Sequence, residues 1–300
     1  MFSTKKRTYK QHFNEKDSFY KYSSPKFKEQ QALSENLNTD ICIVGGGLTG
    51  ISAALNLADQ GYDVCIVEAN KIGSGASGRN GGQLGIGMRK DQLYLENKFG
   101  FEKAEFFWNV GLDAVKNVTN LISKYNIDCA LKPGILHAGN TKKDYKYFIE
   151  EIEHMKSKYS YDNYEYFDEN SIKDEVNTDQ YYSGLLTKDS FHLNPLKLTY
   201  GLANECLNKN VKIFENSSVD TIEEKSDNVL LFSKKAVIKS KKVIVACNGY
   251  LDNLLGSVRN FFMPINNYII ATEPLGEKLA RQIIKRDCGV VDSRFMIDYY

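Results

Sequence analysis

The chain contains, close to its N-terminus, the stretch Ile41-Cys42-Ile43-Val44-Gly45-Gly46-Gly47-Leu48-Thr49-Gly50. Its first four residues form an apolar run, which predicts a strand buried on both faces. The glycines at 45, 47 and 50 form a G-x-G-x-x-G turn. A helix is predicted next, because apolar residues share one face and a glycine suits its C-terminal cap. These residues are Ile51, Ala54, Leu55, Ala58 and the capping Gly61.

A second strand completes the pattern. The run Val64-Cys65-Ile66-Val67 ends at Glu68, which lies 23 residues after Gly45. An ordinary tight turn would explain a lone G-x-G-x-x-G. Here the turn lies in register with a strand, a helix, a second strand and a terminal acid. This combination indicates a βαβ nucleotide-binding unit.

Each part of this unit has a physical role. Gly45 permits a backbone conformation that side chains disfavour. Gly47 lets the chain approach a pyrophosphate, and Gly50 lets the helix pack closely on the strand. The helix N-terminus, at Leu48 and Thr49, presents N–H groups to the phosphates. Glu68, with Ala69 beside it, would accept hydrogen bonds from a ribose diol and repel a 2′-phosphate.

A long loop of small residues follows the second strand, from Ile72 to Gln83. Small residues suit backbone that lies close to an extended ligand, and several side chains add hydrogen-bond donors. A plain flexible linker is the alternative. The cofactor-binding candidates in this loop are Ala76, Ser77, Arg79, Asn80, Gly82 and Gln83.

These residues carry a resemblance to a known family. Residues 40–83 resemble the N-terminus of the FAD-dependent, D-amino-acid-oxidase-like amine oxidoreductases, and residues 76–83 are similar to the gamma-glutamylputrescine oxidase branch. Three later stretches resemble the same branch, so that the likeness runs from about Ser18 to the last residue. They are His192-Leu193-Asn194-Pro195-Leu196, Ala246-Cys247-Asn248-Gly249-Tyr250-Leu251 and Ala271-Thr272-Glu273-Pro274-Leu275-Gly276.

The resemblance implies an α/β fold with a Rossmann-type FAD-binding domain and an interleaved α+β substrate domain, incomplete at the C-terminus. The expected segments are a basic arm (1–36), the FAD-binding domain (37–90 and 190–255) and the substrate domain (91–189 and 256–300). It also implies that Val219 meets the adenine and that Ala246, Asn248 and Gly249 approach the dinucleotide. A simple turn is the alternative for Asn248-Gly249.

The implied reaction is oxidation of the C–N bond of an amine, such as gamma-glutamylputrescine or a related polyamine conjugate. A hydride passes to flavin N5, the product hydrolyses to aldehyde and ammonia, and molecular oxygen is reduced to hydrogen peroxide. One alternative is a glycine, sarcosine or D-amino-acid dehydrogenase or oxidase, whose substrate carboxylate would need a buried arginine. The candidates for that partner are Arg259, Arg281, Arg286 and Arg294.

A second alternative is a truncated FAD-binding fragment without activity. Residues 295–300 read as a strand that stops in its middle, which favours a fragment of a longer protein. No catalytic residue is selected by the sequence. His192, Tyr268 and Tyr300 are polar residues that could face the site, although each fits a structural role better.

Composition narrows the partners. The net charge of +1 argues against nucleic acid, although residues 1–30 hold eight Lys and Arg against three Asp and Glu. No apolar run approaches the length of a membrane span. The six cysteines are scattered, which favours a reducing, cytoplasmic location, and none is selected for a covalent flavin link. The four histidines lack metal-ligand spacing, so no metal is expected. The oligomeric state stays undetermined.

Periodicity predicts the remaining elements. Helices are expected at 102–125, 144–159, 171–176 and 195–208, the last started by Asn194-Pro195. Strands are expected at 129–138, 181–187, 211–214, 219–224, 229–232, 236–239 and 242–247.

Overall fold

The computed structural model describes residues 18–259, 261 and 263–300. The chain forms two compact units, each built from two separate segments. Unit 1 contains the described residues up to Asn80 together with Pro195–Ile269, and unit 2 contains Gly81–Asn194 and Ile270–Tyr300. Both units mix helices with a sheet, so the predicted interleaved α/β fold class is confirmed.

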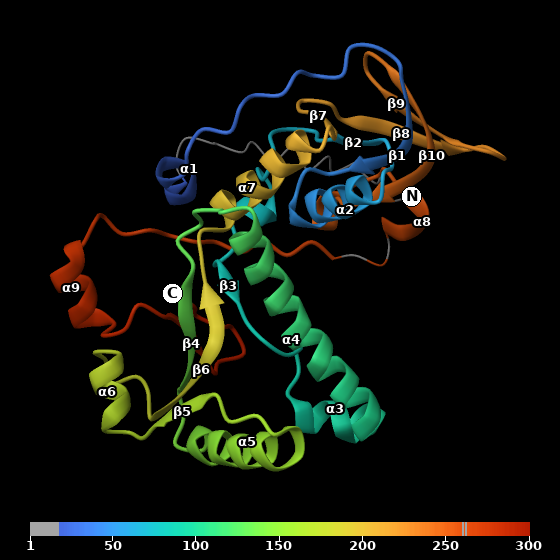
Figure 1. Cartoon of the computed structure of the whole chain (residues 1–300). Coiled ribbons are helices and arrows are strands. Elements are labelled where there is room, and N and C mark those ends of the chain that lie inside the picture. The colour runs from blue at the N-terminus through green and yellow to red at the C-terminus, as the bar shows by residue number, and fades with distance from the viewer. Residues whose placement is uncertain (1–17, 260, 262) are drawn as a thin grey trace, which may run out of the picture. The chain divides into compact units, whose positions relative to one another are not determined.

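Unit 1 is built on a six-stranded sheet in the order β7-β2-β1-β10-β9-β8 (Figure 1). The strands are β1 (Leu37–Val44), β2 (Val64–Val67), β7 (Lys212–Phe214), β8 (Val219–Glu224), β9 (Val229–Ser233) and β10 (Val237–Val245). The pairs β7–β2, β2–β1 and β1–β10 are parallel, whereas β9 pairs antiparallel with both β10 and β8. The carboxyl ends of four parallel strands therefore meet at one edge.

The central strands are buried on both faces, as their continuous apolar runs predict. All four residues of β2 are buried, and so are residues 41–44 of β1. Helix α2 (Leu48–Asp59) buries Ile51, Ala54 and Leu55 and packs against α7 (Pro195–Asn208) (Figure 1). Gly61 has a φ of +86° and donates its N–H to Ala58, so the predicted C-terminal cap is confirmed.

The remaining elements of unit 1 are short. They are helix α1 (Phe19–Ser23), helix α8 (Gly256–Arg259) and the 3₁₀ turns η2 (Ala76–Gly78) and η3 (Asn248–Tyr250). The prediction of two strands at 236–239 and 242–247 is wrong, because β10 runs through both. The polar interruption is accommodated by Ser240, whose hydroxyl donates to the carbonyls of Asp40 and Lys242.

Unit 2 is built on a sheet in the order β11-β4-β6-β3, with β5 also paired to β6. Its strands are β3 (Gln83–Leu84), β4 (Lys132–Gly139), β5 (Tyr164–Phe167), β6 (Ser183–His192) and β11 (Gly289–Asp292). Its helices are α3 (Gln92–Phe99), α4 (Phe101–Lys124), α5 (Asp144–Tyr159), α6 (Ser171–Glu175) and α9 (Gly276–Ile283). The expected break at Pro133-Gly134 is a register shift in the β4–β6 pairing, where Gly134 has a φ of +101°.

The predicted strand at 295–300 is wrong. The side chain of Asp292 accepts hydrogen bonds from the backbone N–H groups of Arg294 and Asp298, which folds the segment into a loop. The last residues of this segment return to β11, where Tyr299 forms an isolated bridge with Val291 and Tyr300 exchanges backbone hydrogen bonds with Val290. The side chain of Phe295 is fully exposed.

The boundaries between the two units also differ from the predicted segment boundaries. Residues 81–90 and 190–194 lie in unit 2, and residues 256–269 lie in unit 1. The described part of the N-terminal arm, residues 18–36, belongs to unit 1, while residues 1–17 lie outside the described residues. The assignment of cofactor and substrate roles to the two units stays a prediction.

Unit 2 carries a carboxyl whose titration tests its packing. Burial raises the pKa of Glu151, on α5, from 4.5 to about 7, and the charge of Asp91 adds to this effect. Because the folded state holds the proton more tightly than the unfolded state, the stabilising contribution is complete below about pH 4.5 and lost as the pH rises to about 7.

We therefore expect Glu151→Gln to raise the free energy of unfolding at about pH 8 by about 2 kcal/mol, with little change at about pH 5. Urea unfolding can be followed by the fluorescence of Trp108, the single tryptophan, which lies 5.0 Å from the ring of Tyr161. Glu153→Gln, at an exposed position of the same helix, is the control. Superimposable pH profiles for wild type and Glu151→Gln would contradict the expectation.

Candidate functional site

The turn between β1 and α2 is held by backbone contacts. Gly45 has a φ of +116°, and a Cβ there would lie 2.6 Å from the carbonyl oxygen of Ala246. A Cβ on Gly50 would overlap the carbonyl oxygen of Gly45 and lie 3.2 Å from Ile43. The predicted roles of Gly45 in the backbone conformation and of Gly50 in helix–strand packing therefore agree with the structure.

The N-cap residue of α2, Gly47, provides no side-chain cap for the N-terminus of this helix. The first-turn N–H groups of a helix lack intrahelical acceptors. The N–H of Leu48 donates to the hydroxyl of Ser77 at 2.9 Å. A Cβ on Gly47 would lie 2.7 Å from that same oxygen. Ser77 thus caps Leu48 from the loop after β2, at a helix N-terminus of the kind that suits an anion.

Glu68 lies at the end of β2, beside this turn. Its carboxylate accepts hydrogen bonds from the N–H of Gly46 at 2.7 Å and the N–H of Asn70 at 2.9 Å. Burial raises the pKa of Glu68, and the charge of Glu215 raises it further, whereas the two N–H bonds act in the opposite direction. The next residue, Ala69, is exposed.

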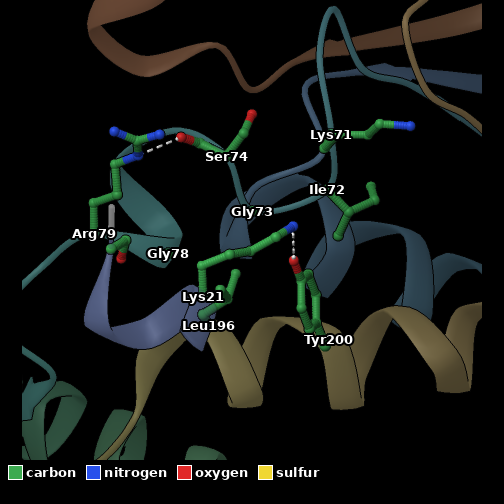
Figure 2. Close-up of a pocket in the computed structure, with 10 residues that line it drawn as sticks. Lys21, Lys71, Ile72, Gly73, Ser74, Gly78, Arg79, Leu196 and Tyr200 are labelled. Carbon is green, nitrogen blue, oxygen red and sulfur yellow. Dashed lines mark hydrogen bonds between the residues drawn. The ribbon is translucent and has the colours of Figure 1, made fainter. Parts of the chain in front are cut away.

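The loop after β2 is ordered by its own hydrogen bonds. Arg79 donates from Nε to the carbonyl of Ser74 at 2.8 Å, and Asn80 donates to the carbonyls of Ala76 and Ser77 at 3.1 and 3.0 Å. Figure 2 shows the Arg79–Ser74 bond at the rim of a small pocket in unit 1. The loop is a folded turn around η2, and the linker alternative is wrong for these residues.

The last two loop candidates belong to unit 2. Gly82 has a φ of +70° and accepts from the N–H of Leu193 at 2.8 Å. Gln83 lies in β3, and its amide reaches the carbonyl of Val290 at 3.4 Å. The sequence pattern predicted one loop over residues 72–83. In the structure, the boundary between the two units falls within this stretch, between Asn80 and Gly81.

The downstream candidates also belong to unit 1, with Ala246, Asn248 and Gly249 directly after β10 and Val219 at the start of β8. Ala246 donates its N–H to Val44 at 2.8 Å, which places it beside the glycine turn. Asn248 has a φ of +49° and starts η3, which also contains Gly249. Val219 is the first residue of β8 and packs against the core of unit 1.

The comparisons with known proteins identify the family. A family model described as "FAD dependent oxidoreductase" matches residues 40–300. The chain belongs to this family of FAD-dependent oxidoreductases.

Two relatives extend the comparison. The chain is 35% identical to the gamma-glutamylputrescine oxidoreductase of Escherichia coli K12, over 94% of this chain and 66% of that protein. It is 34% identical to the probable oxidoreductase OrdL of Haemophilus influenzae, over 89% of this chain and 63% of that protein. The chain therefore spans less than two thirds of the length of these relatives.

Solved structures support the fold. The L-proline dehydrogenase of P. horikoshii matches with a TM-score of 0.60 and 20% identity, over 86% of this chain and 65% of that one. The glycine oxidase of Geobacillus kaustophilus matches with a TM-score of 0.60 and 18% identity, over 76% and 60% of the two chains. At this identity the likeness concerns the fold alone.

The site of this FAD-dependent oxidoreductase fits a dinucleotide on structural grounds. The N-terminus of α2 provides N–H donors, the glycine at 47 allows the close approach of Ser77, and Glu68 offers carboxylate oxygens at the adjacent strand end. The individual contacts of the sequence candidates with FAD stay predictions.

The arginines of unit 2 that were considered as partners of a substrate carboxylate form ion pairs with acidic side chains of the same unit. Arg286 pairs with Glu165 at 2.7 Å and with the buried Glu175 at 2.7 Å. Arg294 pairs with Asp292 and Asp298, and Arg281 lies 3.6 Å from Asp287. The hydrogen bond to Asp292, together with the charges of Asp292 and Asp298, raises the pKa of Arg294.

The three polar residues that could face the site according to the sequence also have defined surroundings. His192 lies 3.0 Å from the carbonyl of Asp287, and the hydroxyl of Tyr300 lies 3.0 Å from that of Tyr181. Tyr268 belongs to unit 1 and is 85% exposed. None of the three is assigned a catalytic role.

Sequence reasoning missed two residues that shape the loop. A Cβ on Gly75 would lie 3.1 Å from the ring of Tyr250, so this ring packs against the loop. Glu215 follows β7 and accepts the N–H of Ile72 at 2.8 Å. An acidic residue directly after a short apolar strand was the available signal for Glu215.

Among the described residues, no helix is long and apolar enough to cross a membrane, and no group of three or more His, Cys, Asp or Glu residues could hold a metal ion.

We expect Gly50→Ala to abolish FAD binding, because the added Cβ pushes α2 away from β1, and to destabilise the chain by about 3 kcal/mol or more. Gly47→Ala should keep the fold, since a side-chain rotation of Ser77 relieves the contact, yet weaken FAD about tenfold. Bound flavin absorbance and thermal unfolding measure the two effects. Gly256→Ala, where a Cβ meets nothing within 4 Å, is the control. Normal flavin content in Gly50→Ala would contradict the placement.

We expect Glu68→Gln to raise the Kd for FAD about tenfold. The substitution removes the negative charge of the group that would accept hydrogen bonds from a ribose diol. Since burial raises the pKa of Glu68, wild-type affinity should fall as the pH drops toward acid, whereas that of Glu68→Gln should stay level. Fluorescence titration with FAD between about pH 5 and pH 8 tests both points. The control is Glu224→Gln, at an exposed position of β8. A parallel pH dependence in both proteins would disprove the role.

Proposed function

We propose that this chain carries the FAD-binding unit and part of the substrate unit of an amine oxidoreductase. Its substrate would be gamma-glutamylputrescine or a related polyamine conjugate, oxidised at a C–N bond with formation of aldehyde, ammonia and hydrogen peroxide. The observation that carries the proposal is the 35% identity to gamma-glutamylputrescine oxidoreductase over 94% of this chain.

In this proposal unit 1 holds the cofactor. The first-turn N–H groups of α2, at Leu48 and Thr49, would receive the pyrophosphate, and Glu68 would accept the ribose hydroxyls. The folded loop of Ala76, Ser77, Arg79 and Asn80 would line the dinucleotide. Ala69, Val219, Ala246, Asn248 and Gly249 would complete its surroundings in unit 1. Gly82 and Gln83 remain cofactor-binding candidates from the sequence.

When bound, FAD supplies the hydride acceptor, so no protein nucleophile is required. The residues of the chain would bind and orient the neutral amine and keep water from it. Molecular oxygen is the proposed electron acceptor. We also propose a reducing, cytoplasmic location, supported by six free cysteines, five of which are buried.

The arginines of unit 2 favour a terminal amine over an amino acid that reacts beside its carboxylate. Such an amino acid needs a guanidinium for that carboxylate. Arg286 and Arg294 already face carboxylates at 2.7 Å, and Arg281 faces one at 3.6 Å, so each would have to leave an ion pair to serve. The position of the Arg259 side chain lies outside the described residues.

The test is flavin reduction without oxygen. The flavin-loaded chain should bleach with gamma-glutamylputrescine and much more slowly with glycine, sarcosine or D-alanine, and admitting air should restore the flavin and release peroxide. Bleaching by the amino acids alone would favour the alternative dehydrogenase or oxidase. Bound flavin that no substrate reduces would identify an inactive FAD-binding fragment.

A further inference from the structure

A buried carboxylate joins two distant segments to the end of β7. Glu215 is 2% exposed. One of its oxygens accepts the N–H of Ile72 at 2.8 Å, and the other accepts the N–H of Gln30 at 3.0 Å. The ammonium of Lys71 lies 3.4 Å from the second oxygen. Glu215 thus binds the start of the loop after β2 and, at the same time, the described part of the N-terminal arm, residues 18–36, called the lead-in.

The lead-in is attached to unit 1 at further points. The ring of Phe27 stacks on Tyr200 with centroids 5.3 Å apart, and Lys21 donates to the Tyr200 hydroxyl at 3.3 Å (Figure 2). The N–H of Leu33 donates to the hydroxyl of Ser217 at 2.8 Å. Glu215 is the point at which this segment and the loop share one acceptor.

The loop that begins at Ile72 carries the candidate cofactor contacts. The N–H of Gly73 donates to the carbonyl of Gly46 at 3.0 Å, and Ser77 accepts from Leu48 at 2.9 Å. The start of the loop is therefore fixed by Glu215 and Gly46, and its next turn brings Ser77 to the N-terminus of α2. A displaced Ile72 would displace Ser77 from the helix end.

A buried carboxylate is costly unless several donors satisfy it. Here the cost is increased by the nearby Glu68, whose pKa the charge of Glu215 raises. A glutamine would offer one acceptor oxygen, whereas Glu215 uses both oxygens for two different N–H groups. The geometry accordingly requires a carboxylate at this position.

We propose that Glu215 is a positioning residue that holds the loop from Lys71 to Arg79 against the N-terminus of α2, with the lead-in as its second anchor. The inference deepens the proposed function, because that loop is the one expected to line FAD. Glu215 itself need not touch the cofactor. Its effect passes through the N–H groups of Ile72 and Gln30.

Limited trypsin digestion of the flavin-free chain tests the positioning without cofactor. Trypsin cleaves after Lys71 and after Arg79, at the two ends of the loop. Glu215→Ala should accelerate both cleavages about tenfold, while cleavage after Lys239 and Lys242, in β10 of the same unit, stays within about twofold of wild type. Glu215→Gln should lie between the two, because one acceptor remains.

The matched control is Glu29→Gln. Glu29 pairs with Lys71 from a side chain that is 76% exposed, so its loss should change loop cleavage and FAD affinity by no more than about twofold. Glu215→Ala should instead raise the Kd for FAD about tenfold.

Three results would overturn the proposal: unchanged cleavage at Lys71 and Arg79, equal acceleration at Lys239 and Lys242, or a loosened loop with unchanged FAD affinity. The second result would indicate a general loss of stability. A wild-type chain that binds no FAD while the variants show the expected cleavage would refute the proposed function and support the positioning role of Glu215.

Discussion

The close approach of Gly50 to the carbonyl of Gly45 is the contact on which unit 1 depends. A Cβ at residue 50 would overlap that oxygen, so α2 can reach β1 only with glycine there. This approach aims the helix N-terminus at the carboxyl edge of the sheet. The helix dipole and the first-turn N–H groups then face the place where an anionic ligand would lie.

The parallel sheet brings the remaining residues to the same edge. β1 pairs with β2 on one side and with β10 on the other, in matched register at Val44, Val67 and Val245. The residues directly after these three strand ends are Gly45, Glu68 and Ala246. Segments some 200 residues apart in the sequence thus form one candidate site, which is the location expected for ligands in open α/β sheets.

The sequence was informative where the physical signal is local. The glycine turn, the buried strands, the cap at Gly61 and the acid at Glu68 all lie within one continuous stretch, and the helices at 144–159 and 195–208 agree with α5 and α7. Local signals failed where a distant or side-chain partner decides the conformation. Asp292 turns the chain that was predicted to be a strand, and Ser240 allows β10 to continue through a polar segment.

Glu215 shows the same limit for the site. Its partners Gln30 and Ile72 lie 185 and 143 residues away in the sequence, so no local pattern connects them. The division of the glycine-rich loop between two units was likewise invisible, because it depends on the pairing of β3 with β6.

An experimental structure of the chain with FAD tests the central claim most directly. We expect the pyrophosphate at the N–H groups of Leu48 and Thr49, with a ribose on the carboxylate of Glu68. Electron density for FAD elsewhere, or for a pyrophosphate that does not contact the N-terminus of α2, would contradict this expectation.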